Sequence, residues 1–240
     1  APPRPVSCAN QYLACRPSRG HTFPMAKQLN YQTLREIFTR FHAADPAPVG
    51  ELDHMNVYTL VVAVALSAQA TDVGVNKATK ELFKIADTPE KMLALGEEGL
   101  IEHIKTIGLF RNKAKNVIKL SQMILDDFGG AVPTTREELI KLPGVGRKTA
   151  NVVMNEAFGQ PTMAVDTHIF SVSNRTGMAP GKDVVDVELN LLRVTPEQYM
   201  MGAHHWILLH GRYTCVARTP KCYDCRIADL CRYTPKTPDP

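Results

Sequence analysis

Apolar residues recur at helical spacing along most of this 240-residue chain. In the stretch 147–158 (RKTANVVMNEAF) they stand three or four positions apart, which predicts a helix. The stretch 32–41 (QTLREIFTRF) has the same spacing and predicts an amphipathic helix. The run 57–66 (VYTLVVAVAL) is almost wholly apolar, and nothing nearby offers it a partner strand, so we interpret it as a central buried helix.

Glycines, prolines and capping residues divide the chain beyond Val57 into successive helices, without a convincing alternating strand. This pattern predicts an all-α protein. A DPAPVGE break at 45–51 marks a boundary behind the first helix. Residues 1–27 contain six Pro and Gly and no acid, and we expect a disordered tail there. No apolar run is long enough for a membrane span, so no membrane partner is expected.

The stretch 142–150 (LPGVGRKTA) joins two predicted helices, because TTREELIKL at 134–142 opens with N-cap residues and acids that favour a short helix. Gly144 and Gly146 are expected to adopt backbone angles closed to other residues, which turns successive N–H groups outward as a seat for an anion. A nucleotide-binding P-loop is excluded because it needs glycine where Arg147 stands. An ordinary glycine-containing helix connection is the alternative.

Basic residues gather around this hairpin. The net charge of the chain is only +4, but residues 105–148 hold nine Lys or Arg against four acids. The hairpin therefore has the basic surroundings of a nucleic-acid site, although a solvated face has a similar composition. Within this segment, 104–118 (IKTIGLFRNKAKNVI) predicts a second helix-turn-helix joint, broken at Gly108. Leu109 and Phe110 follow at the basic turn, where core packing is the alternative role for Leu109.

Four of the six cysteines lie in one short loop, CVARTPKCYDCRIADLC, with six, two and five residues between them. They are Cys215, Cys222, Cys225 and Cys231. Disulfides are disfavoured because the chain carries no secretion signal. Zinc modules normally use paired knuckles set further apart, so this spacing favours a [4Fe–4S] cluster and leaves zinc as the alternative. We expect four nearby cations to offset the negative charge of a cluster: Arg212, Arg218, Lys221 and Arg226.

The hairpin and the C-x6-C-x2-C-x5-C loop together resemble the endonuclease III family of helix-hairpin-helix DNA glycosylases. The resemblance extends over about residues 31–233. It includes LSAQATD at 66–72, KTIGLFRNKA at 105–114, AVDTHIF at 164–170, APGK at 179–182 and HHWILLHGRYTC at 204–215. It implies two helical lobes with DNA crossing between them. One is a six-helix barrel with the hairpin over 50–160, and the other is an iron–sulfur cluster lobe over 28–49 plus 161–240.

The resemblance also assigns roles to single residues. It implies that Lys148 attacks the sugar of a damaged nucleotide and forms a Schiff base, and that Asp166 activates the lysine or stabilises positive charge on the sugar. From the residues alone, a phosphate contact is the preferred role for Lys148, and a helix cap is the alternative role for Asp166. Gln69 would fill the space of an extruded base, with a surface amide as its alternative role, and Leu109 would wedge the duplex.

Further DNA contacts are implied by the resemblance around the hairpin and at one histidine: Leu142, Gly144, Val145, Gly146, Arg147 and His168. The chain departs from the family at one position. The family commonly has an arginine after DTHIF that reaches toward the cluster, whereas this chain has Ser171. We expect this loss to leave the cluster more exposed or to shift its potential.

The function that these observations imply is base excision repair. We expect a monomeric DNA glycosylase with abasic-site lyase activity that removes oxidised pyrimidines from damaged double-stranded DNA. A glycosylase of the same fold for pyrimidine dimers or mispairs is an alternative, because pocket shape sets base choice. A non-enzymatic DNA-binding module with a structural metal is another. Without a targeting signal, we expect a bacterial cytoplasmic, nucleoid-associated location, with a nucleus or organelle left open.

Overall fold

The computed structural model describes residues 26–240, and nearly all of the tail expected over 1–27 lies outside them. Within this range the ordered elements are all helical, which confirms the all-α prediction. The longer helices are α1 (Tyr31–Ala44), α2 (Val57–Leu66), α3 (Asp72–Ile85), α4 (Pro89–Ile104), α5 (Phe110–Phe128), α7 (Arg147–Phe158), α8 (Thr167–Thr176), α9 (Val184–Val194) and α10 (Met200–Tyr213). A four-residue helix, α6 (Arg136–Leu139), and two 3-10 turns, Glu197–Tyr199 and Cys222–Asp224, complete the set.

Short polar side chains set where many of these helices begin. The residue before the first turn accepts a hydrogen bond from a backbone N–H in seven of them, because four N–H groups at a helix start otherwise have no partner. The capping residues are Asn30, Asn56, Thr71, Thr88, Thr135, Asp166 and Asp183. The bounds of α7 agree with the helix predicted over 147–158. The helix predicted from TTREELIKL is shorter and consists only of α6.

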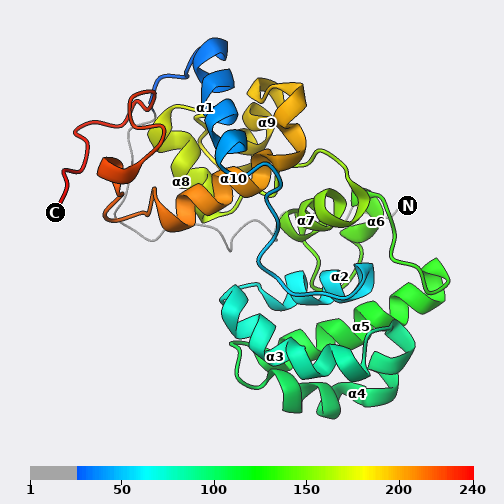
Figure 1. Cartoon of the computed structure of the whole chain (residues 1–240). Coiled ribbons are helices and arrows are strands. Elements are labelled where there is room, and N and C mark those ends of the chain that lie inside the picture. The colour runs from blue at the N-terminus through cyan, green and yellow to red at the C-terminus, as the bar shows by residue number, and fades with distance from the viewer. Residues whose placement is uncertain (1–25) are drawn as a thin grey trace, which may run out of the picture.

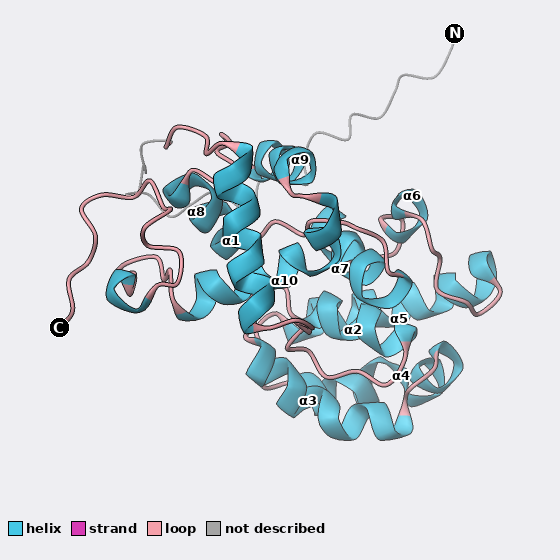
Figure 2. Ribbon diagram, turned by 45° about the horizontal axis from the view of Figure 1, so that its top comes forward, coloured by secondary structure: helices cyan, strands magenta, loops and turns pink. Residues whose placement is uncertain are grey.

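A first hydrophobic core forms around α2. Every residue from Tyr58 to Leu66 is buried, so the prediction of a central buried helix is confirmed. Helices α3, α5 and α7 pack against α2, and α4 packs against α3 and α5. Figures 1 and 2 show α2 to α5 gathered on one side of the molecule. This core is built from one continuous stretch of chain, from Tyr58 to Ala164.

A second core joins the beginning and the end of the described chain. Its buried residues come from Leu29 to Phe41 and again from Met163 to Ile227. Figure 1 shows α1 lying beside α8, α9 and α10, although α1 comes before the whole first core in sequence. At the surface, Arg40 of α1 also pairs with Asp229 of the cysteine loop at 2.7 Å.

Helix α7 lies between the two cores. Val152 and Val153 pack into the first core. On the opposite side, the Asn151 amide donates to the Met163 carbonyl at 2.9 Å, and the Thr162 hydroxyl donates to the Asn151 carbonyl at 2.5 Å. These buried bonds fix α7 against the segment that leads to α8.

The buried side chain of Asn151 provides a test of this arrangement. We expect Asn151→Ala to lower the free energy of unfolding by about 1 to 3 kcal/mol, because the Met163 carbonyl loses its donor inside the protein. Urea denaturation followed by circular dichroism measures the change. The matched control is Asn112→Ala on the exposed face of α5. Equal stability of the two variants would show that the bond does not hold α7 in place.

Candidate active site and metal centre

The hairpin between α6 and α7 uses its two glycines differently. Gly144 has φ of +82°, and a Cβ there would lie 3.2 Å from the Cβ of Asn116, so only glycine suits the position. Gly146 has φ of −97° and ψ of −179°, an extended conformation open to any residue. The expectation of a special conformation is therefore wrong for Gly146. A Cβ on Gly146 would meet nothing within 4 Å, so this residue keeps the approach to α7 open.

The hairpin presents backbone rather than side chains. Leu142 and Val145 are buried in the first core, and the Val145 N–H donates to the Leu142 carbonyl at 3.0 Å, which closes the turn. The N–H groups of Gly144 and Gly146 donate to no partner within residues 26–240. Helix α7 also begins without a side-chain cap. Two unbonded N–H groups at an uncapped helix start form a seat suited to a phosphate.

Arg147 has a role that the sequence did not reveal. Its guanidinium makes a two-pronged ion pair with Glu188 of α9, at 2.7 and 2.8 Å. The Glu188 side chain is only 4% exposed, so the pair ties the start of α7 to the second core. Lys113 of the same basic segment is buried, and Lys105 pairs with Glu102. Part of the positive charge counted over 105–148 is thus buried or already paired.

Lys148 stands in the first turn of α7, directly behind the hairpin, with an exposed side chain. No carboxylate of residues 26–240 lies within ion-pair distance of its amine. Its charge acts on His204, a buried residue of α10. Burial, and then the charges of His205, Lys148 and Arg212, hold the pKa of His204 well below its ordinary value, so His204 adds no positive charge beneath Lys148 at neutral pH.

Asp166 is the N-cap of α8, where one carboxylate oxygen accepts the Ile169 N–H at 2.8 Å. The capping role expected for it is confirmed. Asp166 follows Met163 by three residues, and Met163 is bonded to Asn151 of α7. The starts of α7 and α8 are therefore linked through buried backbone. His168, in the first turn of α8, packs against α10, since a Cβ on Gly211 would lie 3.0 Å from its Cβ.

Gln69 and Leu109 share an unusual conformation. They are the two non-glycine residues of the range 26–240 with positive φ, +55° and +58°. Both are exposed, and Leu109 has 57% of its surface open although it is apolar. A Cβ on Gly108 would lie 3.8 Å from the Gln69 carbonyl, so the two loops touch. Left-handed backbone in such residues is costly and is typical of functional sites.

The four loop cysteines are free thiols that line one cavity. Burial raises the pKa of Cys215 and raises that of Cys225 to about 11. Within residues 26–240, no three His, Cys, Asp or Glu side chains are grouped closely enough to hold a single metal ion. The thiols thus surround a space instead of converging on one point.

Lys221, expected near the cysteines, lines this cavity, and so does Arg175 of α8, which sequence reasoning missed. Its guanidinium donates to the carbonyls of Val216 and Ala217 at 2.9 and 2.6 Å, and to the Cys215 sulfur at 3.4 Å. Ser171, one turn earlier, has a buried hydroxyl without a partner in the described residues. A guanidinium from α8 therefore reaches the cysteine loop from position 175, although position 171 lacks one.

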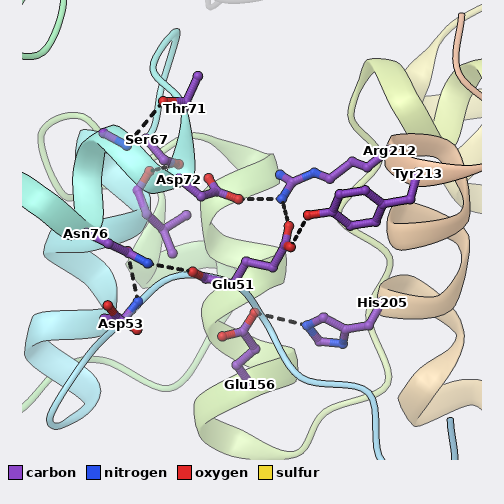
Figure 3. A network of polar contacts seen from close by, with 12 residues as sticks. Glu51, Asp53, Ser67, Thr71, Asp72, Asn76, Glu156, His205, Arg212 and Tyr213 are labelled. Atoms are coloured by element: carbon purple, nitrogen blue, oxygen red, sulfur yellow. Dashed lines mark hydrogen bonds and ion pairs between the residues drawn. The ribbon is translucent and has the colours of Figure 1, made fainter.

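Arg212 does not belong to the charge shell of the cysteine loop, contrary to expectation. It leaves α10 toward the first core and pairs there with Glu51 and Asp72, as Figure 3 shows. Tyr213 donates to Glu51 as well. The sequence placed Arg212 beside the cysteines because it stands three positions before Cys215, but the helix directs its side chain elsewhere.

Comparison with known proteins gives consistent relationships. A sequence model described as HhH-GPD superfamily base excision DNA repair protein matches residues 62–197. A protein named endonuclease III from Escherichia coli strain K12 is 56% identical over 208 residues, which are 87% of this chain and 99% of the relative. Endonuclease III of Bacillus subtilis strain 168 is 54% identical over 205 residues, 85% of this chain and 94% of the relative.

Solved structures resemble the fold to a similar extent. A trapped covalent intermediate of an endonuclease III with DNA has a TM-score of 0.80 and 45% identity, and the match covers 85% of this chain and 97% of that one. A thermostable thymine-DNA glycosylase, with a TM-score of 0.70 and 24% identity, shares the fold over 84% of this chain and 96% of its own. In residues 26–240 no helix is both long and apolar enough to cross a membrane.

The ion pair between Arg147 and Glu188 generates a prediction. We expect Arg147→Met to lower the free energy of unfolding by about 3 kcal/mol, because it leaves the Glu188 carboxylate buried without its partner. The double variant Arg147→Met with Glu188→Leu should recover most of this loss, since no charge is left behind. Urea denaturation of both variants measures the difference. A double variant no more stable than the single one would contradict this account.

Proposed function

The chain belongs to the endonuclease III family, within the HhH-GPD superfamily of base excision DNA repair proteins, and we propose from this that it is a DNA glycosylase with abasic-site lyase activity. The observation that carries the proposal is the position of Lys148. It is exposed and outside any ion pair of the described residues, at the start of an uncapped helix behind a hairpin with unbonded N–H groups. That arrangement brings an amine next to a bound phosphate.

The partner that fits this surface is damaged double-stranded DNA. The N–H groups of Gly144 and Gly146 would hold a phosphate, while Leu142 and Val145 shape the turn from inside. Related proteins of known structure were determined as endonuclease III–DNA complexes. Relatives named endonuclease III come from bacteria, and we propose that this protein likewise acts on the DNA of a bacterial nucleoid.

The reaction begins when the neutral amine of Lys148 attacks the anomeric carbon of the damaged nucleotide. The bond from that carbon to the base breaks, and the base leaves with the electron pair and takes up a proton. Opening of the sugar ring then gives the Schiff base between lysine and sugar. Loss of a proton from the neighbouring sugar carbon expels the 3′ phosphate, which cuts the strand by β-elimination. One lysine thus serves both glycosylase and lyase steps.

Asp166 would support this chemistry electrostatically. One of its oxygens is held by the Ile169 N–H, which fixes the carboxylate, and the other is left for the reacting sugar. A fixed negative charge favours the positive charge that develops on the sugar as the base departs. The carboxylate can also take the proton from the Lys148 ammonium.

Gln69 and Leu109 would stabilise the opened duplex. Extrusion of a nucleotide costs a few kcal/mol, and the cost is smallest for a damaged base. The exposed side chains of Gln69 and Leu109 stand on two loops in contact, so both can enter the DNA duplex at one place. Gln69 would fill the vacated space, and Leu109 would act as an apolar wedge. We propose oxidised pyrimidines as the substrates, in keeping with the endonuclease III family.

The cysteine loop fits a [4Fe–4S] cluster. Its four thiols surround a cavity instead of one point, as needed when each sulfur binds a different iron atom. Burial of Cys215 and Cys225 opposes thiolate charge, so bound cations are needed to hold these two thiols deprotonated. Arg175 and the backbone N–H of Tyr233 donate to sulfurs of the set at 3.4 Å. A cluster would brace this loop as part of the fold, and it supplies no step of the reaction proposed here.

Trapping of the Schiff base tests the role of Lys148. Borohydride added to the protein with a duplex that carries a thymine glycol should give a covalent protein–DNA adduct, because it reduces the intermediate. We expect Lys148→Gln to abolish the adduct, since the variant lacks the amine. The control Lys84→Gln, on the exposed face of α3, should still form it. Denaturing electrophoresis detects the product. An adduct that persists in Lys148→Gln would refute the assignment, and binding without any adduct would favour a DNA-binding module.

Metal analysis tests the second centre. Protein purified without oxygen should contain iron and acid-labile sulfide in equal amounts, together with broad visible absorbance. We expect Cys222→Ala to lose most of both, because three thiols are left around the cavity. Stoichiometric zinc in place of iron would contradict the cluster.

A further inference from the structure

One arginine connects the elements around the first core, here called the first lobe, with those around the second core, the second lobe. It does so on the side of the loop that carries Gln69. Arg212 extends from α10 and pairs with two carboxylates, Asp72 at the start of α3 and Glu51 in the segment between α1 and α2. Figure 3 shows the guanidinium between these two side chains. All three groups are partly buried, so the interaction is weakened less by solvent than a surface ion pair.

The first-lobe end of this bridge adjoins the residues proposed to enter DNA. Asp72 follows Gln69 by three positions, and Thr71 between them caps α3. Gln69 has left-handed backbone, and its carbonyl lies against Gly108, next to Leu109. When Asp72 is held in place, the end of the Gln69 loop that leads into α3 is held in place as well.

The second-lobe end of the bridge adjoins α8, the helix that Asp166 caps. Gly211, the neighbour of Arg212, packs closely against α8. A Cβ on Gly211 would lie 3.0 Å from side-chain atoms of both His168 and Val172. Asp166 caps that helix. The bridge thus spans from the helix of a proposed catalytic residue to the loop of a proposed gap-filling residue.

The Tyr213 hydroxyl also donates to Glu51, but within residues 26–240 the side chain bonded to the Asp72 carboxylate is that of Arg212. The Asn76 amide donates to the Glu51 carbonyl at 2.8 Å, and its oxygen accepts the Asp53 N–H at 3.0 Å, which fixes the 51–53 segment to α3. The pair of His205 and Glu156 joins α10 to α7 further along the helix. Without the guanidinium, Asp72 and Glu51 would be two neighbouring carboxylates that repel each other.

We propose that Arg212 is a positioning residue for base extrusion, which through Asp72 holds the Gln69 loop at a fixed position relative to Asp166. This inference rests on the proposed glycosylase function. With both carboxylates engaged, the Arg212 charge serves this contact rather than a phosphate. Opening the duplex requires the gap-filling loop and the catalytic pocket to act on the same nucleotide together. Loss of the bridge should slow that step and leave the chemistry on an already unstacked nucleotide nearly unchanged.

The test compares two DNA substrates under single-turnover conditions. The first carries thymine glycol opposite adenine, and the second carries it opposite a one-nucleotide gap, where extrusion costs less. Arg212→Met and Asp72→Asn should each reduce excision from the first substrate by about tenfold and from the second by less than about twofold. The double variant should lose no more than either single one, because the two residues act as one unit. Arg212→Lys, which keeps the charge, should recover part of the rate.

A direct readout follows the duplex itself. With 2-aminopurine opposite the lesion, the variants should reach the bright, unstacked state more slowly than the unchanged protein. Arg193→Met, an exposed arginine of α9, is the matched control and should behave as the unchanged protein. Equal losses on both substrates, or no loss on either, would overturn the proposal. If the unchanged protein cleaved neither substrate, the glycosylase function itself would fail, independently of Arg212.

Discussion

Helix α7 is held from two chemically different sides, and the rest of the site depends on this constraint. Apolar packing against α2 sets its axis, while directional bonds to the second lobe set its rotation and position along that axis. Those bonds occur near its start, middle and end, at Arg147, Asn151 and Glu156. Hydrophobic contacts alone tolerate small displacements, whereas directional hydrogen bonds and ion pairs fix the position of the helix more closely. Lys148 therefore has a defined position before any DNA arrives.

The helices were predictable from the sequence because their signals are local. The apolar spacing in 147–158 and the wholly apolar 57–66 each determine one element without reference to distant residues. The pairs that join these elements were not predictable. Arg147 meets a partner 41 positions away and Arg212 one 140 positions away, and nothing in a charge count distinguishes a buried partner from solvent. Gly146 shows the same limit, since a sequence does not reveal which of two glycines needs positive φ.

The role of each positive charge in this protein therefore depends on where the side chain lies, and a count of charges does not reveal it. Arginines 147, 175 and 212 are committed to internal partners, and each connects elements that the sequence separates. Lys148 is left outside the ion pairs of the described residues. A guanidinium suits the internal role because it donates several bonds in fixed directions, whereas an amine suits attack on carbon because it can lose its proton. The separation leaves the proposed nucleophile, Lys148, without a carboxylate partner among the described residues.

The discontinuous second lobe has a consequence for synthesis of the protein. A ribosome releases α1 long before α10 and the cysteine loop, so Phe38 and Arg40 must wait for partners that emerge last. The first lobe, from one continuous stretch, can form in the meantime. Asp166 gains its full surroundings only when the chain is nearly finished. A nascent fragment that already has Lys148 therefore lacks the second core, so the surroundings of Lys148 and Asp166 are complete only after α10 has been made.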